Sequence, residues 1–358
     1  MLPVSPTDMD LARSGSIFSV LGRRYKPVTA WGWLRRAGLA LYLAAYVAVF
    51  FTYGIIVDRI SVTLSVAILL VVVHLGRPWR AWVVLAVDLV LYSAMWVAYD
   101  ETRGIADRFG TPLQVESVRN LDRALFFGTD PNVWLQQNFY FEDHVRWYDV
   151  VASVVYFSHF VVPVAVIAVL WLTNRRQWVR FMRRISTVLG MACIGYVLAP
   201  AAPPWMAAGG DPQRRFQALP PLARPAGRGW RYLGLDSLVH AWETGRDWVN
   251  KTAAMPSLHG AVALLVVVFF FPQIRRWAVR GLLLLYPLVM CISLVYLAEH
   301  YVIDVLAGWA IVGLSFLMWS RIEQRWLSEG TNGPQWRLFW NRARPAVDPV
   351  SPSPPAGP

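Results

Sequence analysis

The sequence predicts an all-α, polytopic integral membrane protein with about eight transmembrane helices. Hydrophobic residues make up 56% of the 358 residues, the mean hydropathy is +0.40, and there are 19 tryptophans. Such a composition is typical of membrane proteins. Most apolar runs approach the ~20 residues that a helix needs to cross a bilayer. No nucleic-acid partner is expected, because the basic residues behind the net charge of +12 lie between these runs.

Eight apolar runs give the expected transmembrane helices, and their flanks divide the chain. The runs lie at about 38–57, 60–75, 81–99, 148–172, 185–200, 257–271, 278–298 and 301–320. The expected division begins with a basic N-terminal arm over 1–37 and three transmembrane helices over 38–99, followed by an outer amphipathic loop over 100–147. A catalytic transmembrane core over 148–320 comes next and includes an outer loop over 201–256. A C-terminal tail occupies 321–358. The last two runs nearly touch, which predicts a tight helical hairpin around Glu299 and His300.

Arginine clusters orient these helices. With eight spans, five segments that carry arginine clusters fall on one side of the membrane: Arg23 to Arg36, Arg77 and Arg80, Arg175 to Arg184, Arg275 to Arg280, and Arg321 to Arg344. The positive-inside rule makes that side the cytoplasm. We therefore expect a multi-pass plasma-membrane protein with both termini in the cytoplasm. The first membrane helix serves as the targeting signal, and both long loops, His259 and His300 face outward.

The two outer loops differ in character. In the first, Leu121 to Gly128 and Pro131 to Gln136 carry apolar residues that suggest amphipathic helices at the membrane interface. The second is rich in proline and glycine and carries seven basic residues between Arg214 and Lys251. These can attract anionic headgroups or phosphates, or they can form local ion pairs in a solvated loop. Composition leaves both interpretations open.

Two short polar motifs point to chemistry at the outer helix ends. They are Met255 to Gly260 and Glu299 to Asp304. His300 and Asp304 are four residues apart and share one helix face, so the carboxylate can take the Nδ1 proton and leave Nε2 as a nucleophile toward phosphorus. His259 can protonate the leaving oxygen as a general acid. The alternative is that both histidines merely pack at helix ends.

The start of the helix that carries His259 is a candidate phosphate cradle. Pro256 and Ser257 precede that helix, whose first backbone N–H groups lack helical partners. The Ser257 hydroxyl adds another donor toward a bound phosphate. No metal and no cofactor are expected, because neither motif has metal-ligand spacing.

At these motifs the chain resembles the type 2 phosphatidic acid phosphatase superfamily, in particular its branch of inositol phosphorylceramide synthase (aureobasidin-resistance) proteins and bacterial relatives. The resemblance covers roughly residues 115–320 and implies a six-helix phosphatase-like core. The matching segments are Met255 to His259, Tyr296 to Asp304 with Leu306 to Gly308, Tyr196 to Trp205, and Asp122 to Gln136.

Two departures from the superfamily pattern affect phosphate binding. The superfamily's first signature, a lysine followed after six intervening residues by Arg-Pro, is missing. Leu294 stands six residues before His300, where the superfamily has an arginine. This fits a headgroup transferase better than a plain phosphatase. Replacement cations can come from Lys251, Arg123, Arg146 or the second outer loop, and the sequence does not choose among them.

Further polar residues are candidates for substrate contact. His159 lies in an apolar run, where an ionisable group suggests function. It can line a lipid cleft or bind an inositol-like hydroxyl, or it can make a hydrogen bond between helices, and Asp88 has the same two interpretations. Tyr301, beside His300, is a further candidate for substrate binding. Cys193 and Cys291 are expected to be packing residues.

The expected function is that of a membrane phosphotransferase. It would move a phosphoryl-linked, inositol-phosphate-like headgroup between lipid or glycolipid substrates at the outer leaflet through a phosphohistidine. One alternative is a phosphatase for lipid phosphates or polyprenyl (pyro)phosphates. Another is a lipid transporter, although a transporter favours a midplane site and internal repeats. The expected partners are the bilayer and a membrane phospholipid, polyprenyl lipid or glycolipid, whereas the sequence does not determine the oligomeric state.

Overall fold

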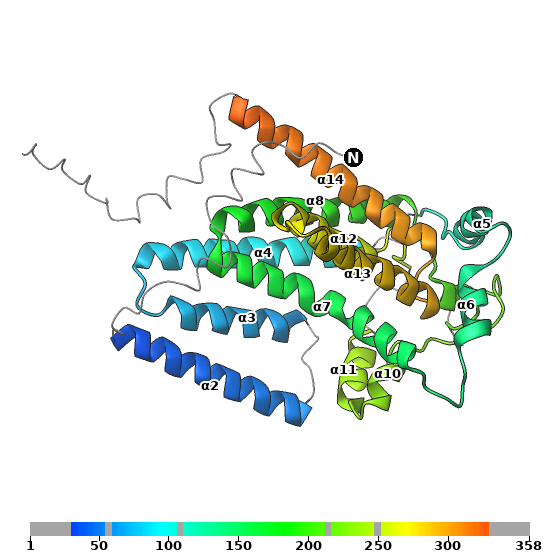
Figure 1. Ribbon diagram of the computed structural model, residues 1–358, viewed down its shortest axis with the longest axis horizontal. Helices are drawn as coiled ribbons and strands as arrows, with labels where there is room; N and C mark the ends of the chain where they lie inside the picture. The colour runs from blue at the N-terminus through cyan, green and yellow to red at the C-terminus, as the bar shows by residue number, and fades with distance from the viewer. Residues whose placement is uncertain (1–29, 54–58, 106–109, 212–215, 247–251, 329–358) are drawn as a thin grey trace, which may run out of the picture.

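The computed structural model describes residues 30–53, 59–105, 110–211, 216–246 and 252–328. Every regular element in these ranges is helical (Figure 1). Extended backbone contributes two isolated bridges there, from Gln114 to Ala201 and from Ala201 to Ala253. The all-α class predicted from the sequence is confirmed. Residues 1–29 of the predicted N-terminal arm and residues 329–358 of the predicted C-terminal tail lie outside the described residues, whereas residues 30–37 of the arm form the start of a helix.

Each of the eight expected transmembrane segments coincides with a helix. These are α2 (Ala30–Tyr53), α3 (Arg59–His74), α4 (Trp79–Ile105), α7 (Trp147–Thr173), α8 (Arg175–Leu198), α12 (Leu258–Phe270), α13 (Trp277–Tyr296) and α14 (Val302–Ser328). The connections contain the shorter helices α5 (Glu116–Leu125), α6 (Pro131–Phe139), α9 (Pro204–Ala207), α10 (Arg228–Tyr232) and α11 (Asp236–Arg246), and the 3₁₀ turn η3 (Phe271–Gln273).

Five helices are long and apolar enough to cross a membrane. Among the described residues they are Trp79–Thr102, Trp147–Thr173, Arg175–Leu198, Trp277–Tyr296 and Val302–Trp326, while Leu64–His74 and Leu258–Gln273 are shorter apolar helices. The chain is thus an all-α membrane protein.

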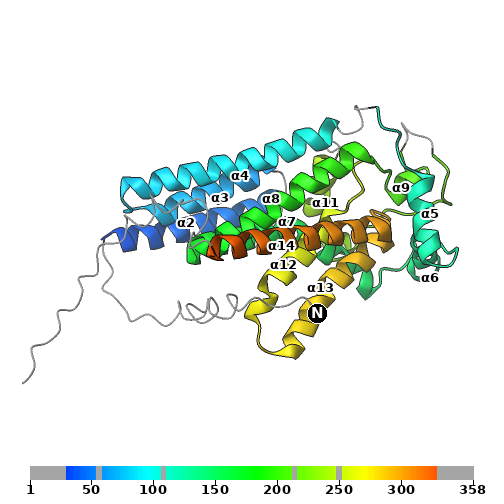
Figure 2. The same cartoon turned by 90° about the horizontal axis from the view of Figure 1, so that it is seen from above.

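α12 packs against α7, α8, α13 and α14, and Figure 2 shows it beside α13 and α14. Its 13 residues are almost all apolar, and most of them are buried. At 1.5 Å per residue the helix is about 20 Å long, shorter than the hydrocarbon core of a bilayer, which is about 30 Å thick. The four neighbouring helices surround α12, and they place its first residues, including His259, inside the bundle.

The helices α2, α3 and α4 form a layer beside this core. α4 packs against α8, α3 against α4, and α2 against α3 (Figure 1). Large apolar side chains stay exposed on this layer, such as Leu41 at 72% and Val90 at 66%. In a bilayer such a surface faces lipid.

The short helices gather at one end of the bundle, and the basic turns lie at the other (Figure 1). At the basic end, Arg175 of α8 holds Asp88 of α4 through two hydrogen bonds of 2.5 and 2.6 Å, and Trp171 of α7 donates a third. Asp88 therefore makes interhelical bonds, one of its two expected roles. The opposite end, where α13 ends and α12 and α14 begin, carries both histidine motifs.

Candidate active site

His259 is the second residue of α12, two residues after Ser257, which caps this helix. Ser257 is buried, and its Oγ accepts a hydrogen bond of 3.4 Å from the Gly260 N–H, as an N-cap does. The Ser257 N–H donates to the Asp304 carbonyl at 2.8 Å. The start of α12 is therefore tied to the first turn of α14, which carries the second motif.

His300 lies in the turn between α13 and α14, as the hairpin prediction requires. α13 ends at Tyr296 and α14 begins at Val302, and the N–H groups of both Glu299 and His300 donate to the Leu294 carbonyl. Ala298 has a positive φ of 55°, which reverses the chain within a few residues. The turn leaves His300 largely buried.

Asp304 stands behind His300 on the first turn of α14. Its Oδ2 lies 3.4 Å from His300 Nδ1 and also accepts the Tyr301 N–H at 2.9 Å. The carboxylate is fully buried, and it gains from the positive end of the helix dipole. Asp304 is thus placed to hold the Nδ1 proton of His300 and leave Nε2 for attack, as the four-residue spacing predicts.

The two histidines of the motifs lie together, and a third joins them. The ring centroids of His259 and His300 are 5.6 Å apart. His159 of α7 approaches His259 to 4.0 Å, and Tyr156, one turn earlier on α7, stacks on His259 at 4.8 Å with an interplanar angle of 14°. The orientation of His259 therefore depends on α7 as well as on its own helix.

Two amides of α6 hold the backbone around His300. Asn132 Nδ2 donates to the carbonyls of Val295 and His300 at 2.8 and 3.0 Å. Gln136, one turn later, donates to the Tyr296 carbonyl at 2.8 Å. Because buried carbonyls need partners, these bonds fix the shape of the turn. The sequence showed both amides, but it did not show that their partners lie some 160 residues away.

Asp122 of α5 caps the start of α14. Its two carboxylate oxygens accept the N–H groups of Val302 and Ile303 at 2.9 and 2.8 Å. Burial raises the pKa of Asp122 to about 6, against the lowering effect of these two hydrogen bonds. The helices of the first outer loop thus position the catalytic turn, a task that their amphipathic pattern did not disclose.

The remaining predicted site residues lie apart from the three histidines or outside the described residues. Tyr301 is 1% exposed and packs in an apolar cluster with Val118 and Ala254, and burial raises the pKa of its hydroxyl. Arg123 Nε donates to the Gly128 carbonyl at 3.0 Å, in the turn after α5. Lys251 lies outside the described residues. The roles predicted for these three residues stay predictions.

Sequence reasoning missed a buried ion pair beside His300. Arg224 of the second outer loop donates to both carboxylate oxygens of Glu299, at 2.6 and 2.7 Å. The loop was expected either to attract anions or to form local ion pairs. The sequence did not show that Arg224 pairs with Glu299, because a proline-rich loop has no hydrophobic periodicity that would place it against a distant helix end.

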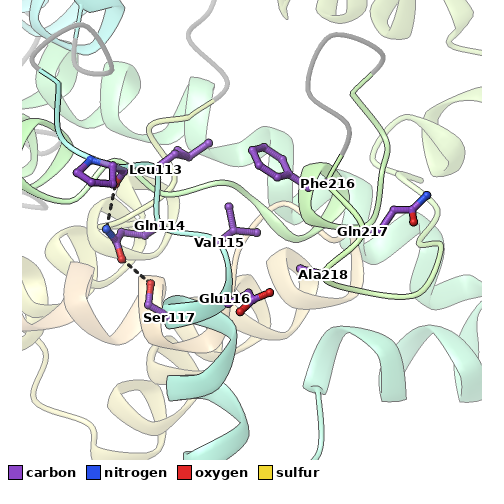
Figure 3. A pocket seen from close by; sticks show the side chains of 9 residues that line it. Leu113, Gln114, Val115, Glu116, Ser117, Phe216, Gln217 and Ala218 are labelled. Atoms are coloured by element: carbon purple, nitrogen blue, oxygen red, sulfur yellow. Dashed lines mark hydrogen bonds between the residues drawn. The ribbon is translucent and has the colours of Figure 1, made fainter.

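The histidines of the site do not line the hollow that the structure forms between two connecting segments. It measures about 620 Å³ between the segments 112–117 and 216–218 (Figure 3). Gln114 donates to the Pro112 carbonyl and accepts a bond from the Ser117 hydroxyl. Val115 also packs against the apolar clusters of Tyr301 and Ala298. The hollow is thus separate from the His259–His300 pair.

The close approach of α12 and α14 depends on Gly308. A Cβ at this position would lie 2.4 Å from the Ser257 carbonyl oxygen and 3.3 Å from the Ala261 Cβ. We expect Gly308→Ala to cost about 1–3 kcal/mol of stability through overpacking. It should also lower turnover, because it displaces the cap of the helix that carries His259. Thermal unfolding in detergent and an activity assay measure both effects.

Gly313→Ala is the matched control on the same helix, because a Cβ there meets nothing within 4 Å. It should be neutral or slightly stabilising, since alanine is the better helix former. Equal losses in the two variants would contradict the packing argument.

Comparison with known proteins supports the importance of this end of the molecule. A family model described as the PAP2 superfamily matches residues 116–318. The chain is also 29% identical over 259 residues to a Bacteroides thetaiotaomicron protein named phosphoinositol dihydroceramide synthase, covering 71% of this chain and 82% of that protein. No solved structure matches the chain. The family match runs from α5 into α14 and includes both histidine motifs.

Proposed function

Because the chain belongs to the PAP2 superfamily, we propose that it transfers a phosphoryl-linked headgroup between lipids through a phosphohistidine on His300. That it is a lipid phosphotransferase or phosphatase follows from the family and from its relative. The mechanism is our inference. The observation that carries it is the placement of the His300–Asp304 pair beside His259, with ring centroids 5.6 Å apart.

In the first step, His300 Nε2 attacks the phosphorus of the donor lipid. A P–N bond forms, and the P–O bond to the leaving alcohol breaks. His259 gives the leaving oxygen its proton, and Asp304 stabilises the positive charge that develops on His300. In the second step, an acceptor hydroxyl passes its proton to His259 and attacks phosphorus, and the P–N bond breaks. Both residues return to their starting protonation states.

The supporting residues of the site have distinct proposed roles. Ser257 accepts the Gly260 N–H with its lone pairs, so its hydroxyl hydrogen can donate to a phosphoryl oxygen. His159, packed against His259, is placed to contact a hydroxyl of the headgroup. For Tyr301, Arg123 and Lys251 we keep the role in substrate binding that the sequence predicts.

The headgroup that we propose is an inositol phosphate. The relative from Bacteroides thetaiotaomicron is named for phosphoinositol and dihydroceramide, and it aligns over most of both chains. We infer a phosphoinositol lipid as donor and a ceramide-like alcohol as acceptor. Hydrolysis of a lipid phosphate is the second candidate, because water can replace the alcohol in the second step.

The test uses purified protein in liposomes that contain phosphatidylinositol labelled with radioactive phosphorus, with and without dihydroceramide. The proposal expects a new labelled sphingolipid that appears when the acceptor is present, and no loss of activity on treatment with a chelator. Release of a water-soluble phosphate alone would favour the phosphatase. A labelled donor that stays unchanged under all conditions would contradict both.

We place the active site on the extracytoplasmic side of the plasma membrane. Glu142 lies in the connection between α6 and α7, and Arg275 lies in the connection between η3 and α13. In a chain with Cys193 and Cys291 replaced by serine, a cysteine at position 142 should react with an impermeant maleimide added to intact cells. A cysteine at position 275 should react only after permeabilisation. The reverse pattern would invert the topology.

A further inference from the structure

The ion pair of Arg224 and Glu299 is built into the wall of the active site. Arg224 Nε and Nη2 donate to the two carboxylate oxygens, and the side chains are only 19% and 8% exposed. Glu299 immediately precedes His300. A buried bidentate pair is costly to assemble from solvated ions, which suggests a role beyond stability.

Gln136 holds the backbone of Arg224 in place. Its side-chain amide donates to the Ala223 carbonyl at 2.8 Å and accepts the Ala223 N–H at 2.9 Å, so both backbone polar groups of the residue before Arg224 are fixed. The same amide binds the Tyr296 carbonyl at the end of α13. Pro225 follows and restricts the backbone further. The loop is thus tied to the turn that carries the nucleophile.

The guanidinium of Arg224 is stacked on an indole that is also tied to this turn. Arg224 Cζ lies 4.1 Å from the centre of the Trp205 ring. The backbone N–H of Trp205 donates to the Ala298 carbonyl at 3.0 Å. The side chain and the backbone of Arg224 are therefore both held against residues 296–300.

Arg224 keeps its positive charge close to the histidines. Burial opposes the charge, but Glu299 outweighs it and raises the pKa of Arg224, and the hydroxyl of Tyr156 adds to this effect. Tyr156 in turn stacks on His259. The cation is thus bound to the residue that precedes His300.

Other arginines described at this end contact other partners. These are Arg119 with Asp130, Arg123 with the Gly128 carbonyl, Arg146 with the Phe141 ring, Arg228 with the Phe141 and Glu142 carbonyls, and Arg231 with Glu243.

We propose that Arg224 is the cation that binds the phosphoryl oxygens of the donor lipid and of the phosphohistidine, and that Glu299 holds it in place until an anion competes for it. This inference rests on the proposed function. Phosphoryl transfer depends on positive charge placed at the equatorial oxygens. A guanidinium has five N–H groups in a planar fork that suits phosphate.

The experiment compares Arg224→Gln, Arg224→Lys and Glu299→Gln with Arg231→Gln and Glu243→Gln. The control pair lies in the same loop and makes the same kind of contact, but its side chains are about half exposed. Two quantities are measured for each purified protein: the initial rate of protein labelling by radioactive phosphatidylinositol, and the rise in melting temperature that orthovanadate produces.

Arg224→Gln should lower the labelling rate by about 10²–10³-fold and abolish the vanadate-induced shift, because the charged donor is gone. Arg224→Lys should retain part of both, since an ammonium keeps the charge but loses the fork. Glu299→Gln should retain or enlarge the vanadate shift, because it removes the competing carboxylate. Both control variants should stay within about twofold of the parent chain.

A purely structural ion pair would behave differently. Equal loss of labelling in Arg224→Gln and Glu299→Gln, with the vanadate shift unchanged in both, would overturn the assignment. If Arg224→Gln does not fold, the other two variants decide. Loss of the vanadate-induced shift in Glu299→Gln would overturn the assignment of Arg224, whereas a shift retained in both Glu299→Gln and Arg224→Lys would support it. An unmodified chain that takes up no label would instead contradict the proposed function.

Discussion

Replacement of His300 by alanine is expected to abolish headgroup transfer. His300 lies beside the buried carboxylate of Asp304 and close to His259, so its replacement removes the proposed nucleophile. Turnover should fall by at least about 10⁴-fold, to the level of the assay background. The measurement is the rate of labelled sphingolipid formation in liposomes at saturating donor.

His144→Ala is the control for this variant, because His144 is exposed in the first outer loop and has no place in the site. It should keep its activity. Residual transfer by His300→Ala at more than a few per cent of the original rate would exclude the phosphohistidine route and point to direct attack by the acceptor.

Replacement of Asp304 by asparagine should cost roughly 10²–10⁴-fold in rate, by analogy with the orienting carboxylate of hydrolase triads. The amide keeps the size of the side chain and can still accept the Tyr301 N–H through its oxygen. It cannot stabilise a positively charged His300. The measurement pairs the rate with the melting temperature, so that a catalytic loss is separated from unfolding.

The carboxylate of Glu299 offers a comparison for Asp304→Asn. Glu299 precedes His300 in the sequence and binds Arg224, whereas Asp304 lies beside the imidazole of His300. An Asp304→Asn enzyme with nearly full activity would show that His300 needs no orienting partner. That result would remove one of the three assigned catalytic roles.

The placement of His259, His300 and Asp304 near one another could be predicted from the sequence because its signal is local. His300 and Asp304 are one helical turn apart, and Ser257 and His259 follow a proline at a helix start. The eight apolar runs likewise overlap eight helices, of which five are long and apolar enough to cross a membrane. The 13-residue α12 shows the limit, because a short apolar run does not reveal whether lipid or protein surrounds it.

The rest of the site depends on contacts between distant parts of the chain. Asn132 and Gln136 bind backbone carbonyls some 160 residues away, and no side-chain pattern marks those partners. Arg224 comes from a proline-rich loop whose position is set by Gln136 and Trp205. His159 was a candidate from its place in an apolar run, but only the packing of α7 against α12 brings it to His259.

The most direct test of the phosphohistidine is the chemistry of the labelled protein. After brief exposure to a lipid donor labelled at phosphorus, the denatured protein should carry label that acid removes and base does not, as expected of a phosphorus–nitrogen bond. His300→Ala should carry none, and His259→Ala should take up label more slowly, because the leaving oxygen lacks its proton donor. Label on His300→Ala with none on His259→Ala would contradict the account and reverse the roles of the two histidines.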